Sequence, residues 1–242
     1  MCQTPEEAKL FDQIVAKIYL KHDQLGHVLG CSFLYTSRKT FTGGARIVFL
    51  GINPGGAKRE SNVESVELGN AHYSELWDDG VRLSKLQLQV CRLYKIVARK
   101  LYPNDSSLPN RLMDEAIQSN FIPFRSHKSE TLHEPKKSRS FACELWKEIF
   151  SNLFAKTAPR VIVWHGVEEF DRYSKQILPG FSFNKAPTGW KRRPYRYGIW
   201  QHNGQQVYVL GLPQLSRYTI ISNPKCVAAV DTFTDQIANA LR

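Results

Sequence analysis

The chain has 242 residues, of which 42% are hydrophobic and 12% aromatic, and its formal net charge is +11. This composition fits one large domain, and no apolar run reaches the roughly 18 residues that a membrane-spanning helix needs. The N-terminus lacks the basic-then-apolar layout of a signal peptide, and the five scattered cysteines have no metal-binding spacing. We therefore expect a cytoplasmic protein with reduced thiols, no metal, no cofactor and no membrane partner.

The positive charge is concentrated in one stretch near the C-terminus. Residues 172–230 contain nine Lys or Arg and no Asp or Glu, whereas the rest of the chain holds 24 basic and 22 acidic residues. A surface field of one sign attracts a polyanion. We therefore expect DNA as the partner, and the alternative is a basic face that serves solubility alone.

Predicted strands and helices alternate along the chain, which indicates a three-layer α/β domain. Residues 1–45 form an N-terminal helix and loop, and residues 46–242 form the core of a single domain. A hairpin is expected to turn at Asn203 and Gly204. The predicted elements are helices over 5–22, about 74 or 80 to 101, 140–155, 167–178 and 225–241, and strands over 47–50, 114–124, 160–164, 194–201 and 205–211.

The segment 46–55 carries the strongest functional signal. Its apolar residues 47–50 are typical of a buried parallel strand, and a Pro-Gly-Gly sequence then forces a turn. Asn53 is thereby held at the carboxyl end of a strand, where open α/β sheets bind their ligands. Its neutral amide can hold a water molecule or contact a ligand edge, but it cannot act as a strong base. The alternative is an Asn that only closes its own turn.

Three segments together resemble the uracil-DNA glycosylase superfamily. Residues 51–55 (Gly-Ile-Asn-Pro-Gly) are similar to the first catalytic motif of its mismatch-specific and single-strand-selective branches. Residues 120–126 resemble the strand-end segment whose Asn reads the flipped base, and residues 212–217 resemble, more loosely, the second motif, a loop that enters the DNA. The resemblance spans roughly residues 45–241. It implies a central, mainly parallel four-stranded sheet and a monomeric enzyme with no obligate protein partner.

The resemblance also implies a reaction, in which a base is flipped out of DNA and its N-glycosidic bond is hydrolysed. In that reaction Asn53 positions the attacking water, and Asn120 reads the base edge through its amide donor and acceptor. For Asn120 the alternative is a buried amide that ties strand ends together. Further base contacts are expected from Gly51, Ile52 and Phe124. DNA contacts are expected from the loop residues Gln214, Leu215, Ser216, Arg217 and Tyr218.

One departure from the family pattern concerns the second motif. In most branches this motif begins with a His that donates a hydrogen bond to the leaving base, but here Gly211 or Leu212 takes that place. The mismatch-specific branch also lacks this His, so activity is not excluded. The remaining donors are backbone amides, Gln214 or Ser216. The alternative is a catalytically inactive DNA-binding module with the same fold.

A second departure concerns the pocket. Relatives follow the first motif with a Gly- and Phe-containing segment that stacks on uracil, whereas residues 57–64 are mostly polar here. We therefore expect a roomier pocket for a larger base, such as the glucosylated hydroxymethylcytosine of some phages, and a role in anti-phage defence. The alternatives are a surface loop, with Phe124 or Tyr73 stacking on the base, and repair of uracil or mismatches. The side chains predicted to bind the larger base are Arg59, Glu60, Asn62 and Glu64.

Basic and aromatic residues mix over residues 185–197, a combination that binds phosphates and stacks on exposed bases. The alternative is an ordinary hairpin flank. Residues 133–139 form a second basic loop of low specificity, and we expect His165 to be a structural residue at the end of a strand. No Gly-x-Ser-x-Gly or phosphate-binding loop is present, which argues against a small-molecule hydrolase or nucleotide-binding enzyme. The basic residues expected to contact DNA are Lys191, Arg192, Arg193 and Arg196.

Overall fold

The apolar runs of the sequence form the centre of one sheet in a computed structural model, which describes residues 4–41, 44–55, 62–76, 81–127, 131–155 and 158–242. The sheet has six strands in the order β2-β1-β3-β6-β5-β4. The strands are β1 (Ile47–Gly51), β2 (Ile117–Asn120), β3 (Val161–His165), β4 (Asn184–Ala186), β5 (Tyr195–His202) and β6 (Gln205–Leu212).

The mixed α/β class and the mainly parallel sheet are confirmed, but the predicted number of four strands is wrong. Strands β2, β1, β3 and β6 pair in parallel, and the hairpin then adds β5 and β4 in antiparallel orientation. The hairpin turns at Asn203 and Gly204 as predicted, and both residues have positive φ. Strand β4 has three residues with largely exposed side chains, so no apolar pattern indicates it.

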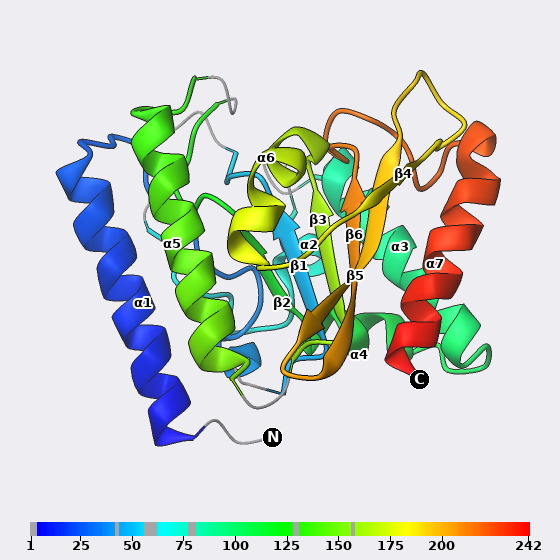
Figure 1. The fold of residues 1–242 in the computed structure, drawn as a ribbon, viewed down its shortest axis with the longest axis horizontal. Coiled ribbons are helices and arrows are strands. Elements are labelled where there is room, and N and C mark those ends of the chain that lie inside the picture. Colours follow the sequence, from blue (N-terminus) through cyan, green and yellow to red (C-terminus); the bar gives the residue numbers. More distant parts are fainter. Residues whose placement is uncertain (1–3, 42–43, 56–61, 77–80, 128–130, 156–157) are drawn as a thin grey trace.

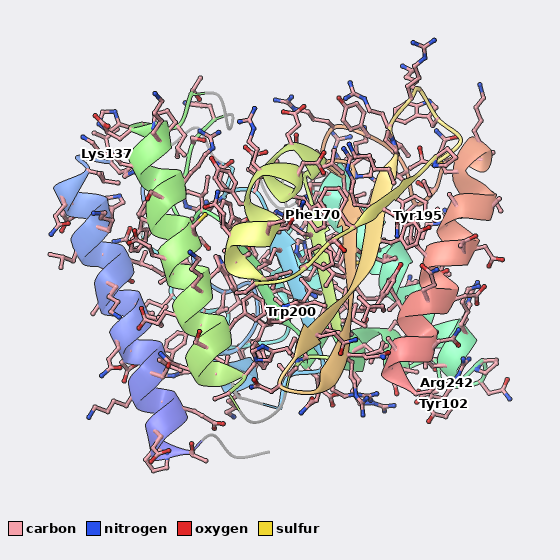
Figure 2. The ribbon with its side chains drawn as sticks, viewed as in Figure 1. Tyr102, Lys137, Phe170, Tyr195, Trp200 and Arg242 are labelled. Carbon is pink, nitrogen blue, oxygen red and sulfur yellow. The ribbon has the colours of Figure 1, made fainter. Side chains whose placement is uncertain are left out.

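Helices cover both faces of the sheet (Figure 1). One face packs against α1 (Pro5–Gln24), α5 (Pro135–Leu153) and α6 (Val167–Ile177). The other face packs against α3 (Lys85–Leu101), α4 (Leu108–Asp114) and α7 (Val227–Leu241). The short α2 (Ala71–Ser74) contacts α3. Figure 2 shows Phe170 and Trp200 on the side of α5 and α6, and Tyr195 on the side of α7.

Capping residues set several helix boundaries that differ from the predicted ones. Helix α3 begins at Lys85, because Ser84 and Gln87 form a capping box there. Helix α5 begins at Pro135, five residues before the predicted start, since Pro is favoured in the first turn. Residues 135–139 of the predicted basic loop therefore lie in α5. Helix α4 was not predicted from the sequence.

The carboxyl ends of the four parallel strands lie at one edge of the sheet, at the top of Figure 1. The register places Gly51 beside Asn120, and His165 beside Leu212. Segments that are far apart in the sequence therefore meet at this edge. Among the described residues, no helix has the length and apolarity required to cross a bilayer.

Candidate functional site

A cavity of about 400 Å³ opens at the carboxyl edge of the parallel strands. Its volume falls in the range of small-molecule sites, which is about 300–1,000 Å³. Residues from the ends of β1, β2 and β3 and from the loop after β6 line it. It brings together seven residues that were predicted from the sequence to form the site, namely Gly51, Ile52, Asn53, Asn120, Gln214, Ser216 and Arg217.

The amide of Asn53 is held by two hydrogen bonds. Its Nδ2 donates to the carbonyl oxygen of Pro54 (3.0 Å) and to the hydroxyl of Ser126 (2.9 Å). The first bond closes the turn, and the second ties the end of β1 to the segment after β2. Because both N–H groups are used, the carbonyl Oδ1 is the atom of this amide that can bind a ligand or a water molecule.

Asn120 lies against Gly51 on the neighbouring strand. Asn120 is 6% exposed, and its Nδ2 donates to the hydroxyl of Tyr35 (2.6 Å). A Cβ on Gly51 would lie 2.2 Å from Asn120 Oδ1 and 3.0 Å from His165 Nε2. Position 51 therefore requires a glycine because the two neighbouring strand ends fill the space of a side chain.

The Gly51→Ala substitution is expected to lower the free energy of unfolding by about 1–3 kcal/mol, since Asn120 is fixed by Tyr35 and must be displaced. Urea denaturation measures this change. Gly55→Ala is the matched control in the same turn, because a Cβ there meets nothing within 4 Å. Equal stability of the two variants would contradict this view of the strand ends.

The loop after β6 is held in place by hydrogen bonds to one buried side chain, Gln89 on α3. Its Oε1 accepts from the backbone N–H of Ile220 (2.6 Å) and of Ile221 (3.0 Å), and its Nε2 donates to the carbonyl oxygens of Leu215 and Tyr218. Leu215 is itself 0% exposed and packs in the core. Its predicted contact with DNA is therefore corrected, whereas Ser216 and Arg217 on the same loop are exposed.

The basic turn between β4 and β5 lies next to this loop. The guanidinium of Arg193 lies over the ring of Tyr218, 4.5 Å from its centroid, and Trp190 packs edge-on against the same ring. Lys191 and Arg192 are exposed and adopt left-handed backbone conformations, with φ of 46° and 50°. The two segments predicted to bind DNA are thus joined into one surface.

Arg196 does not belong to this surface. It is 7% exposed, and its guanidinium forms a bidentate ion pair with the carboxylate of Asp171. A guanidinium committed in this way has no free face for phosphate, so the predicted DNA contact is corrected. Asp171 directly precedes the acid-free stretch of the sequence, so the charge pattern gives no sign of this ion pair.

Several predicted base contacts do not line the cavity. Phe124 is 0% exposed and packs against His27 and Phe141 in the core, so its predicted role is corrected. Tyr73, the alternative residue for stacking on the base, is also outside the cavity lining, and its hydroxyl donates a hydrogen bond to the carboxylate of Asp114. Asn62 accepts from the backbone of Cys31, and Glu64 accepts from Tyr19. Arg59 and Glu60 lie outside the described residues.

Five aromatic or imidazole side chains line the cavity although they were not predicted from the sequence to do so: Tyr35, Phe49, His72, His127 and His165. Burial lowers the pKa of His72 to about 4. Burial and, to a lesser extent, the neighbouring His72 lower the pKa of His165 to about 3. The imidazoles of His72 and His165 are therefore neutral near pH 7. For His165, its place at the end of an apolar run in the sequence could have indicated a position at the cavity. His72 lies on a four-residue helix, which is too short to show a hydrophobic pattern in the sequence.

Comparison with known proteins adds no family to these observations. No protein-family model matches the chain, and no curated protein matches its sequence.

Proposed function

We propose that the protein is a monofunctional DNA glycosylase, which flips a non-standard pyrimidine out of DNA and hydrolyses its N-glycosidic bond to leave an abasic site. The observation that carries this proposal is the meeting of Asn53, Asn120 and the loop 214–217 at one cavity. An oriented amide oxygen, a second amide at a strand end and an exposed loop are the parts that such a reaction needs.

The proposed chemistry places most of the work on binding and orientation. Cleavage of the glycosidic bond builds positive charge on the sugar and negative charge on the base. Asn53 presents its Oδ1 to a water molecule and directs that water at the sugar carbon. Asn120 contacts the base edge, and its side chain is held against Gly51 for this purpose. Neither amide takes a proton, so the rate depends on how well the base leaves.

The cavity has room for a large base that carries polar groups. Polar side chains such as Tyr35, His127 and Gln214 line it together with apolar ones such as Phe49, Ile52 and Leu86. A hexose has hydroxyl groups on every side, which suit such a lining. We therefore propose a bulky modified cytosine, such as the glucosylated hydroxymethylcytosine of phage DNA, and a role in anti-phage defence.

The exposed cations beside the cavity are proposed to bind DNA phosphates. We expect the double variant Lys191→Glu/Arg192→Glu to bind DNA more weakly for every sequence. The slope of log affinity against log salt concentration should fall by about one for each phosphate that the variant no longer binds. Fluorescence anisotropy over a salt series measures both. The control is Lys9→Glu/Arg99→Glu, which changes two exposed cations on α1 and near the end of α3. Equal weakening in both variants would contradict a localised DNA surface.

Incubation of the purified protein with three DNAs tests the substrate. The DNAs carry uracil, hydroxymethylcytosine or glucosylated hydroxymethylcytosine, and alkali cleaves the strand wherever an abasic site forms. Strand cleavage of the glucosylated DNA supports the defence role. Cleavage of the uracil DNA alone would replace it with a repair role, and DNA binding without any cleavage would indicate an inactive module.

A further inference from the structure

The cavity contains a buried imidazole to which the proposed reaction has so far given no role. His165 is the last residue of β3, and it is 5% exposed. In the sheet, β3 lies between β1 and β6. His165 is therefore placed between the turn that carries Asn53 and the loop that follows β6. Its backbone pairs with Leu212 of β6, and the preceding Trp164 also pairs with Leu50 of β1.

The hydrogen bonding of His165 is incomplete within the described part of the chain. Its Nδ1 is buried and has no hydrogen-bond partner there. Its Nε2 lies 3.0 Å from the position that a Cβ on Gly51 would take, so this edge of the ring borders the cavity at Gly51. Nε2 is therefore the ring nitrogen that a ligand in the cavity can reach, whereas Nδ1 is buried on the other side of the ring.

Most N–H groups of the side-chain amides of Asn53, Gln87 and Asn120 around the cavity already donate hydrogen bonds to other groups of the protein. Both N–H groups of Asn53 are used, as described above, and the Nε2 of Gln87 donates to the carbonyl oxygens of Ala71 and Glu75. Asn120 donates to Tyr35. A neutral imidazole, by contrast, always carries one N–H. His165 can direct that N–H into the cavity beside Gly51, where the parallel strands end.

We infer that His165 donates a hydrogen bond from Nε2 to the exocyclic oxygen beside the glycosidic nitrogen of the departing pyrimidine. This inference rests on the proposed glycosylase function. The bond between the sugar carbon and the base nitrogen breaks, and its electron pair leaves with the base. Water adds its oxygen to the sugar carbon, and one of its protons ends on the released base. A fixed donor aimed at the oxygen that gains charge lowers the barrier to this step.

His72 is the rival donor, because it also lines the cavity as a neutral imidazole. It lies on the four-residue helix α2 rather than on a central strand. We therefore assign the donor role to His165, whose position relative to Asn53 and Asn120 is fixed by the sheet.

Single-turnover rates and DNA affinities of four variants test this inference, measured on whichever of the three DNAs the wild-type protein cleaves fastest. His165→Phe keeps a planar ring without a donor and is expected to slow base release by about 10²–10³-fold. Its DNA affinity and melting temperature should match those of the wild type. His165→Asn restores an N–H and should recover part of the rate, which a purely structural role would not predict. His72→Phe should have the smaller effect. His202→Phe, on β5 and outside the cavity, should leave the rate of base release unchanged.

The outcomes separate the two proposals. A wild-type protein that releases no base from any of the DNAs overturns the glycosylase function and this inference with it. Active wild-type protein with an equally active His165→Phe variant overturns the inference alone. The same holds if His165→Asn is as slow as His165→Phe, if His72→Phe has the larger effect, or if the slower rate follows a weaker DNA affinity.

Discussion

The Asn53→Ala variant is expected to lose base release by at least about 10²-fold while it still binds DNA. The substitution removes the amide oxygen that presents water to the sugar, and misplacement of a reacting group by about 1 Å costs a comparable factor. Asn53 is partly buried at the cavity and lies in a turn rather than in the core, so the fold should persist. Single-turnover kinetics and anisotropy with the same labelled DNA measure both properties.

Ser126→Ala is the graded companion to this variant. It deletes one of the two hydrogen bonds that orient the Asn53 amide and leaves the bond to Pro54 in place. We expect a rate between those of the wild type and Asn53→Ala. If Asn53→Ala retained the full rate, Asn53 would have no part in the reaction.

Gln89→Leu is expected to have the largest effect on stability, lowering the free energy of unfolding by about 3 kcal/mol or more. Leu has a similar volume but leaves the buried N–H groups of Ile220 and Ile221 and the carbonyl oxygens of Leu215 and Tyr218 without this partner, and each unpaired buried group costs about 1–3 kcal/mol. The loop that bounds the cavity should also lose its position. Urea denaturation and base-release rates measure the two effects.

Gln176→Leu is the matched control, because Gln176 is exposed on α6 and the one hydrogen bond that its side chain makes to a described residue is a long one, to the carbonyl oxygen of Arg172. Its effect on unfolding should stay within about 0.5 kcal/mol. A Gln89→Leu variant as stable as this control would show that the loop does not depend on Gln89.

The strand ends of the site could be predicted from the sequence, because a buried apolar run followed by a turn fixes where a parallel strand stops. Asn53 and Asn120 both follow this rule, and the register brings their strands together. The hairpin could also be predicted from local sequence, because Asn203 and Gly204 favour the positive φ angles of its turn.

Side-chain direction within loops could not be predicted, because it depends on packing between distant segments. Leu215 and Phe124 follow strands as Asn53 does, yet both point into the core. Gln89 looks like a solvent-facing residue of an amphipathic helix until the loop of residues 215–221 covers it. Arg196 looks like a free cation until Asp171 on the preceding helix is placed beside it.

Mass spectrometry of the free base tests the central claim most directly, with uracil, hydroxymethylcytosine and glucosylated hydroxymethylcytosine DNA as substrates. We predict that wild-type protein releases an intact modified base and leaves one abasic site for each base, and that Asn53→Ala releases none. Release of no base by the wild-type protein, or equal release by the two proteins, would contradict a hydrolysis directed by the amide at the end of β1.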